Sequence, residues 1–254
     1  AGLVRLANGT QTRYGGGDAL PGDLSSARVM DVLRDREGGL WIGLLEGGIA
    51  RLPARWRNFS VWRHRPGQEA SLRHTVSEAL SIDSEGGIWV GGGRDGVDHI
   101  DSASGDIVRH GDRLNVQGSK LRSVLQVGEF LWVGHQQGIR RYALDGSGMI
   151  ELPVDAESTA ALPRGYVNQM LLGANSILWA SLRGGGVARI DPQTLTICSY
   201  SVGSGTLGDA DISNLVLDPQ GTPWIATSAG VERYNVGLYR FEKVLSRHGI
   251  DIPR

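Results

Sequence analysis

This chain of 254 residues has a single cysteine, no long apolar run and no marked excess of either charge. Its one cysteine, Cys198, cannot form an internal disulfide and is expected to be a small buried residue. No apolar stretch approaches the ~18 residues that a transmembrane helix needs. A net charge of −1 creates no global field that would favour nucleic acid or an anionic membrane. We therefore expect a globular protein without nucleic-acid partners.

Signatures of metal binding and catalysis are missing as well. No histidine has a second histidine or cysteine two or four positions away, and one cysteine cannot form a zinc cluster. The chain contains neither a Gly-x-Ser-x-Gly elbow nor a P-loop. We expect no metal, no cofactor and no enzymatic activity.

What the chain does contain is a repeat. A short motif with a central tryptophan recurs five times, at residues 39–43, 87–91, 130–134, 177–181 and 222–226. The repeated tryptophans are Trp41, Trp89, Trp132, Trp179 and Trp224. Each is followed by an apolar run that opens with glycine, at residues 48–52, 96–100, 138–142, 186–190 and 230–234. The period is fixed at about 46 residues, which fits propeller blades better than a sandwich.

Two further short segments rich in β-branched or aromatic residues complete each repeat. The first precedes the tryptophan, at residues 29–33, 76–82, 121–127, 167–172 and 212–217. The second ends the repeat, at residues 58–64, 106–110, 148–152, 196–201 and 239–244. Glycine, aspartate, asparagine or proline separates the segments, which indicates strands joined by turns. Four strands per repeat predict an all-β fold, a β-propeller of four-stranded antiparallel blades.

The repeated residues have a structural explanation. One blade cannot bury both of its faces, so the tryptophan is expected to fill the space between neighbouring sheets. Three copies place an aspartate six residues before the tryptophan: Asp35, Asp83 and Asp218. Such an aspartate is expected to accept hydrogen bonds from amides of the turn between the first two strands. Because Gln126 and Gly173 replace it in the other two copies, we assign it a structural role.

The phase of the repeat predicts about five complete blades plus a partial one. Residues 2–6 resemble the run that follows each tryptophan, and residues 252–254 resemble residues 162–164, which open a repeat. We expect residues 1–254 to form a single β-propeller domain or a propeller fragment. Residues 245–254 are then the start of a further blade or a linker.

The motif Asp-x-x-Gly-x-Leu-Trp-Ile-Gly, followed by Gly-Gly-Ile-x-Arg-Leu, resembles the two-component regulator propeller repeat. Residues 35–52 and 83–100 match it best, and the resemblance extends over essentially the whole chain. It implies the periplasmic sensor region of a membrane-anchored bacterial receptor, of the hybrid two-component or diguanylate cyclase type. It also implies an output signalling domain elsewhere in the full-length protein. The family motif is a folding motif and implies no catalytic residue.

A ligand would be expected at the mouth of the propeller channel, where two sets of loops gather. The loops entering the first strands carry Arg28, His74, Lys120, Arg122, Tyr166 and Asp211. The loops between second and third strands carry Arg94, His135 and Arg183, together with Glu46 and Asp95. Such a polar and mostly basic ring suits a carbohydrate or an organic anion. The alternative is a solvated rim, because loop ends are polar by default.

Three functions remain open: a non-catalytic sensor, a lyase and a protein-interaction platform. A lyase resembling virginiamycin B lyase would need His135 to meet Glu46 or Asp95 at a metal. A platform, including a homodimer, would be favoured by an exposed apolar patch around Trp56 and Trp62, which otherwise pack on the outer strand of a blade. His99 and Arg140 are interpreted as exposed strand residues at matching positions of their repeats.

Overall fold

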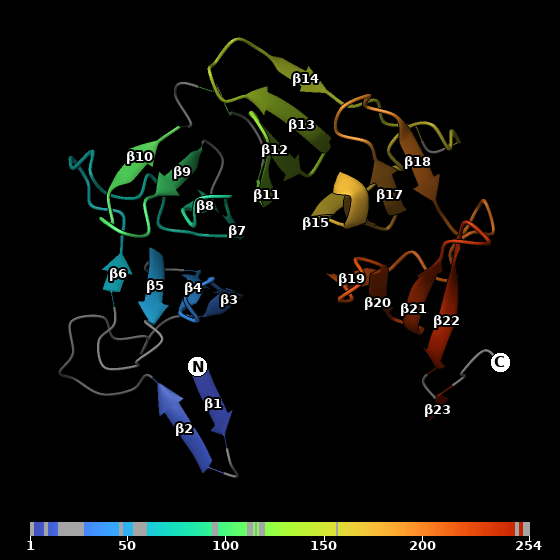
Figure 1. Cartoon of the computed structure of the whole chain (residues 1–254), viewed down its shortest axis with the longest axis horizontal. Helices are drawn as coiled ribbons and strands as arrows, with labels where there is room; N and C mark the ends of the chain where they lie inside the picture. Colours follow the sequence, from blue (N-terminus) through green and yellow to red (C-terminus); the bar gives the residue numbers. More distant parts are fainter. Residues whose placement is uncertain are drawn as a thin grey trace. The chain divides into compact units, whose positions relative to one another are not determined.

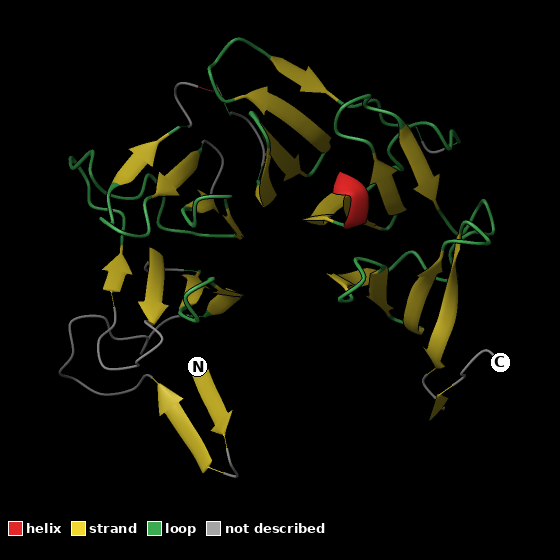
Figure 2. Cartoon of the chain, in the orientation of Figure 1, coloured by secondary structure: helices red, strands yellow, loops and turns green. Residues whose placement is uncertain are grey.

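The computed structural model describes residues 3–7, 10–14, 28–45, 48–52, 60–92, 96–110, 114, 116, 120–155, 157–246 and 249–250. Over these residues the structure consists mainly of β-strands and turns, with a short 3₁₀ helix, η1 (Ala174–Ser176) (Figure 2). None of the helices described is long and apolar enough to cross a membrane.

The described strands form six antiparallel sheets, five of them blades of four or five strands, in which strands pair in sequence order (Figure 1). Blade 1 contains β3 (Val29–Arg34), β4 (Leu40–Leu44), β5 (Gly48–Leu52) and β6 (Ser60–Trp62). Blade 2 contains β7 (Ala79–Ile82), β8 (Ile88–Gly91), β9 (Val97–Ile100) and β10 (Ile107–Arg109). Blade 3 contains β11 (Leu121–Val127), β12 (Phe130–His135), β13 (Gly138–Ala143) and β14 (Met149–Glu151). Blade 4 contains β15 (Tyr166–Leu172), β16 (Leu178–Arg183), β17 (Gly186–Ile190) and β18 (Ile197–Tyr200).

Blade 5 contains β19 (Ile212–Leu217), β20 (Pro223–Thr227), β21 (Gly230–Asn235) and β22 (Arg240–Ser246). A short fifth strand, β23 (Gly249–Ile250), pairs with β22. Before blade 1, β1 (Leu3–Ala7) and β2 (Thr10–Tyr14) form a two-stranded sheet at the place expected for a partial blade. The predicted all-β fold of four-stranded propeller blades is confirmed.

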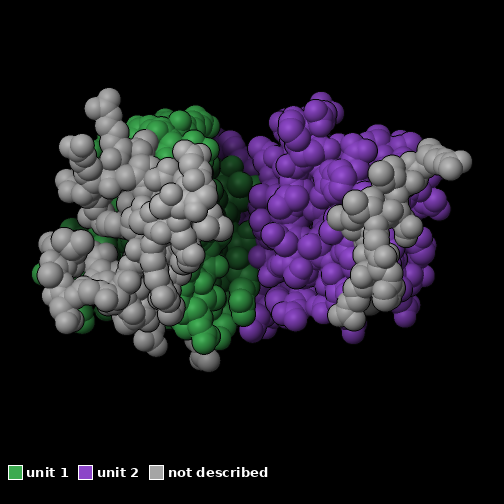
Figure 3. Space-filling view, turned by 90° about the horizontal axis from the view of Figure 1, so that it is seen from below, with its two compact units in different colours: residues 1–126 green, residues 127–254 purple. Residues whose placement is uncertain are grey.

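The chain divides into two compact units, Ala1–Gln126 and Val127–Arg254, coloured separately in Figure 3. Unit 1 contains blades 1 and 2, and unit 2 contains blades 4 and 5. A single propeller domain over residues 1–254 stays a prediction. In the segment 245–254, the end of β22 and β23 extend the last sheet, whereas residues 251–254 lie outside the described residues.

The repeated tryptophans fill the space between successive sheets of a unit. Trp41 of blade 1 is fully buried against Ile88, Val90 and Ile100 of blade 2. Trp179 of blade 4 lies in a cluster with Leu215 and Tyr234 of blade 5. Trp224 of blade 5 is only half-buried. Burial of the indole therefore follows from stacking of one blade on the next, as the repeat predicts.

The aspartates organise the turns between first and second strands, which confirms their structural role. In blade 1, Oδ1 of Asp35 accepts hydrogen bonds from the amides of Glu37 (3.1 Å) and Gly39 (2.6 Å). Oδ1 of Asp83 likewise accepts from Glu85 and Gly87, and Oδ1 of Asp218 accepts from Gln220 and Thr222. Each carboxylate thus satisfies two turn amides that the β-ladder leaves unpaired.

The second carboxylate oxygen reaches across the blade. Oδ2 of Asp35 accepts from Nε1 of Trp41 (3.0 Å) and from the guanidinium of Arg51, whose Nη2 lies 3.1 Å away. In blade 5, Oδ2 of Asp218 accepts from Trp224 (3.2 Å) and Arg233 (3.4 Å). The aspartate, the tryptophan and a basic residue on the third strand therefore form one hydrogen-bonded unit, called here the Asp–Trp–Arg unit.

The interpretation of His99 as an exposed residue equivalent to Arg140 is wrong. His99 stands opposite Trp89 in the β8–β9 register, so its equivalent opposite Trp132 is Arg141, not Arg140. Its Nε2 lies 2.6 Å from Oδ2 of Asp83, and its side chain is only 22% exposed. His99 therefore occupies the basic position of the Asp–Trp–Arg unit. Nε1 of Trp89 donates instead to Oε1 of Gln126 (2.7 Å).

Candidate functional site

The predicted channel-mouth residues of unit 1 differ in how exposed they are and in whether they lie in a loop or a strand. Arg28 is exposed directly before β3, and its carbonyl accepts from the amide of Leu45 (2.9 Å). His74 is half-buried in the segment that leads to β7, and Lys120 is exposed before β11. Arg122 lies within β11 and is half-buried. Arg94 lies outside the described residues, as do Glu46 and Asp95.

In unit 2 the structure brings three predicted residues together, and we call Tyr166, Arg183 and Asp211 the rim cluster. Tyr166 opens β15 and Arg183 ends β16, and the two are cross-strand partners. The guanidinium lies 5.9 Å from the centre of the Tyr166 ring, and Nε of Arg183 lies 3.0 Å from Oδ1 of Asp211. The bond with Asp211, followed by the interaction with Tyr166, raises the pKa of Arg183. An anion that binds here must compete with Asp211 for this guanidinium.

His135 does not lie in a loop, so its predicted position is wrong. It is the last residue of β12 and is only 1% exposed. Burial, together with the charge of Arg140, lowers the pKa of His135 to about 4, so the imidazole is neutral at pH 7. Its Nδ1 accepts from the amide of Gln137 (3.2 Å). Within the described residues, no three histidine, cysteine or acidic side chains are placed to hold a metal ion.

Two buried carboxylates were not predicted from the sequence: Asp98 and Glu232, each 3% exposed. Each is the third residue of the run that opens with glycine in its repeat. Blades 1 and 4 have Ala50 and Ala188 at this position. Each accepts from a backbone amide of the segment that leads into its own blade. The donor is Arg73 for Asp98 (2.7 Å) and Gly208 for Glu232 (3.0 Å). A charged residue where sister repeats have alanine was the available sequence signal.

Burial dominates the titration of both groups. It raises the pKa of Asp98 to about 6, although the Arg73 amide and the charges of Arg109 and His64 oppose the rise. Burial also raises the pKa of Glu232, against the Gly208 amide and the charge of Lys243. Each carboxylate holds the segment that leads into its blade through a hydrogen bond. Because the group is buried, its charged form is destabilised.

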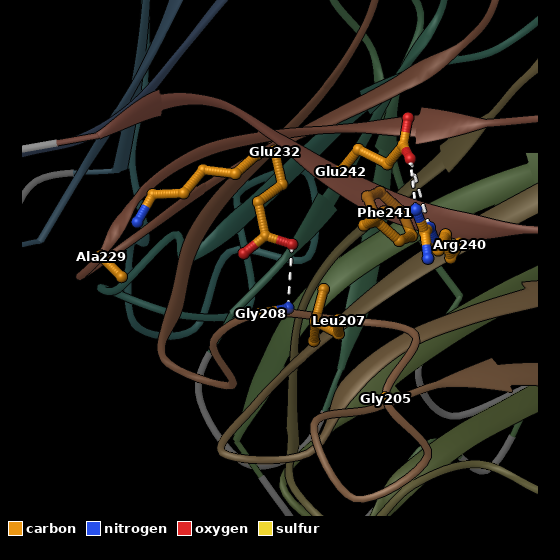
Figure 4. A pocket seen from close by; sticks show the side chains of 9 residues that line it. Gly205, Leu207, Gly208, Ala229, Glu232, Arg240, Phe241 and Glu242 are labelled. Carbon is orange, nitrogen blue, oxygen red and sulfur yellow. Dashed lines mark hydrogen bonds and ion pairs between the residues drawn. The ribbon is translucent and has the colours of Figure 1, made fainter. Parts of the chain in front are cut away.

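A pocket of about 420 Å³ opens beside Glu232 (Figure 4). The backbone of Gly205 and Gly208 forms one wall, and Phe241 and Lys243 of β22 line another. Arg240 is already bound to Glu242, with Nη2 and Oε1 2.8 Å apart. The lining mixes acidic and basic groups, so it suits a polar ligand without favouring one sign of charge.

The patch expected to favour a protein-interaction platform is not formed by Trp62. Its ring stacks on Trp41 with centroids 4.9 Å apart, and its Nε1 donates to the carbonyl of Gly105 (2.9 Å). Trp62, which ends the outer strand of blade 1, therefore packs against Trp41 of its own blade. Trp56 lies outside the described residues.

No protein-family model matches the chain, and no curated protein matches its sequence. Its structure is similar to the extracellular domain of BT3049, a putative hybrid two-component system of B. thetaiotaomicron. The TM-score is 0.78 at 17% identity, over 100% of this chain and 33% of that one. The extracellular domain of a second such system, BT4673, gives a TM-score of 0.54 at 15% identity, over 98% of this chain and 39% of that one.

Catalytically inactive virginiamycin B lyase from Staphylococcus aureus, in complex with quinupristin, is also similar. Its TM-score is 0.65 at 18% identity, over 92% of this chain and 73% of that one. The chain spans about a third of the BT3049 domain and about two fifths of the BT4673 domain. At identities below 20%, these structural similarities show the fold alone, that of β-propeller blades. The structural neighbours include the class of receptor domain that the repeat motif resembles.

Proposed function

We propose that the chain is part of the extracytoplasmic sensor region of a bacterial membrane receptor and carries no catalytic activity. The observation that supports this most strongly is the fit of the whole chain onto part of the extracellular domain of BT3049, at a TM-score of 0.78. The repeat motif at residues 35–52 and 83–100 points to the same family independently of the coordinates. The ligand would be a carbohydrate or an organic anion, or the partner a second propeller in a homodimer. An output signalling domain would follow in the full-length protein.

The lyase is the weaker alternative on chemical grounds. The only histidine proposed for it, His135, is buried in β12 with a pKa lowered to about 4. A general acid or base works best when its pKa lies near the working pH and when it reaches the substrate. A neutral, enclosed imidazole meets neither condition.

Location is the direct test of the sensor proposal. An epitope inserted into the exposed turn at residues 145–147 of the full-length protein should be accessible to antibody in spheroplasts with an intact inner membrane. The control is a cytoplasmic protein that carries the same epitope and is labelled only after lysis. Labelling of the chain only after lysis would overturn the proposal.

Catalysis needs a separate test. The purified chain is incubated with quinupristin, the compound bound in the similar lyase structure, and conversion is followed by chromatography. We expect no conversion above that of the buffer. Turnover that His135→Ala abolishes would establish the lyase instead.

A further inference from the structure

Blade 4 contains the donors of an Asp–Trp–Arg unit without its carboxylate. Trp179 and Arg189 are cross-strand partners in β16 and β17, as Trp41 and Arg51 are in blade 1. The position of the aspartate is held by Gly173, whose amide bonds to the carbonyl of Ile177 (2.7 Å). The described residues of unit 2 offer no ion pair to Arg189 within 4.0 Å and no hydrogen-bond acceptor to Nε1 of Trp179.

A pocket of about 250 Å³ lies beside these donors, between blades 4 and 5. Trp179 and Arg189 line it from blade 4. Asn175 and Ile177 also line it, and they hold the turn positions whose amides bind the aspartate in blade 1. Gln220 and Thr222 from the first turn of blade 5, and Tyr234 and Tyr239 around its last turn, complete the wall.

Neighbouring groups do not substitute for the carboxylate. Oδ1 of Asp191 accepts from the amides of Thr194 (3.1 Å) and Gln193 (2.8 Å) in its own turn, which lowers its pKa. The charge of Arg189 contributes to lowering the pKa of Asp191, but the two form no ion pair within 4.0 Å. In blade 3, which also lacks the aspartate, Arg141 has other partners. Its Nη1 donates to the carbonyl of Pro192 (3.1 Å), and its guanidinium lies 4.1 Å from the centre of the Phe130 ring. Blade 4 has no such bond from Arg189, so its guanidinium stays available at the pocket.

We propose that this pocket binds the carboxylate of a small organic acid between Trp179 and Arg189. One ligand oxygen would take the place that Oδ2 of Asp35 has in blade 1, where it accepts from both an indole and a guanidinium. Charge-assisted bonds of this kind are about twice as strong as neutral ones. The aromatic wall of Trp179 and Tyr234 suits a planar or hydroxylated body. The volume is below that of typical drug-sized sites, so the acid is small.

This inference goes beyond the proposed function, since it concerns binding by the chain itself wherever the chain is located. If the chain binds no acid, the result of the location experiment still stands. If the chain is cytoplasmic, the result of the binding experiment still stands.

The test is titration of the purified chain with benzoate and glucuronate, each compared with its uncharged counterpart, benzamide or glucose. The ¹H–¹⁵N spectrum of the tryptophan indoles reports the site, with the Trp179 signal assigned from Trp179→Phe. We expect at least one of the two acids, and neither counterpart, to shift the Trp179 indole signal. Arg189→Gln should weaken binding about tenfold or more, since it removes a charge-assisted bond.

Two variants separate binding from folding. Arg233→Gln alters the same repeat position in blade 5, where Asp218 already occupies the site, and should leave the affinity unchanged. Gly173→Asp should supply the internal carboxylate and abolish binding while the other indole signals keep their positions. The proposal is overturned if neither acid shifts the Trp179 signal, or if Arg189→Gln and Arg233→Gln affect the affinity equally.

Discussion

Nε2 of His99 lies 2.6 Å from Oδ2 of Asp83, so a histidine does in blade 2 what an arginine does in blades 1 and 5. Burial tends to raise the pKa of Asp83. The bonds from His99 and from the amides of Glu85 and Gly87 outweigh burial and lower it overall. The carboxylate therefore contributes stability as an anion.

Asp83→Ala should reduce the free energy of unfolding at pH 7 by about 2–4 kcal/mol, because it leaves the Gly87 amide and His99 without an acceptor. The folded pKa lies below the unfolded one, so this contribution is complete above pH 4 and is lost as the pH falls below it. Urea unfolding at pH 7 and at pH 3 measures both effects. Ser84→Ala, in the same exposed turn, is the control. Equal losses from both variants would contradict the assignment.

The pKa of Asp98 is raised, whereas that of Asp83 is lowered, so its effect on stability as the pH changes is the reverse. A pKa of about 6 in the folded state, against 3.8 for the free group, means that the folded protein binds the proton more tightly. The wild-type chain should therefore lose stability as the pH rises from 4 to 6, by an upper bound of about 3 kcal/mol. Asp98→Asn should lack this loss in urea unfolding measured across that range. The exposed Asp106→Asn should retain the wild-type profile, and identical profiles for both variants would exclude a buried titrating Asp98.

Gly186 and Gly184 flank the same hairpin of blade 4 but tolerate a side chain differently. Gly186 has φ +133°, and a Cβ there would collide with the carbonyl oxygen of Tyr200. Gly184 has φ +80° with open space around it. Gly186→Ala should cost about 3 kcal/mol or more, whereas Gly184→Ala should cost about 1 kcal/mol, the strain of a left-handed alanine. Thermal melting compares them, and equal melting temperatures would contradict the close approach of β17 and β18.

Arg183 and Arg51 both pair with an aspartate, but only Arg51 is enclosed. Both partners of the Arg183–Asp211 pair are 54% exposed, whereas the side chains of Arg51 and Asp35 are 17% and 4% exposed. Arg183→Gln should leave the melting temperature unchanged, because solvent screens exposed pairs. Arg51→Gln should destabilise unit 1 by about 1–3 kcal/mol, because it strands a buried carboxylate. A larger loss from Arg183→Gln would show that the rim cluster is structural.

The strands were predictable because each repeat presents the same local pattern five times. The role of the turn aspartates was equally predictable, since it depends on residues only two and four positions away. The rim cluster was predicted in part: Tyr166, Arg183 and Asp211 come from three segments that the propeller topology brings to one end of blades 4 and 5. His135 was misplaced because one residue of strand length decides between a loop and a buried strand end.

The amino-acid sequence by itself determined the blade, because period, tryptophan, glycine and turn aspartate are local and repeated. Only the tertiary structure decided which side chains complete one another. His99 binds Asp83, and the indole of Trp89 donates to Gln126. Trp179 lines a pocket where a carboxylate would complete the Asp–Trp–Arg unit of blade 4. Hydrogen-bond partners and burial depend on distances across strands and between blades, which no spacing along the chain specifies.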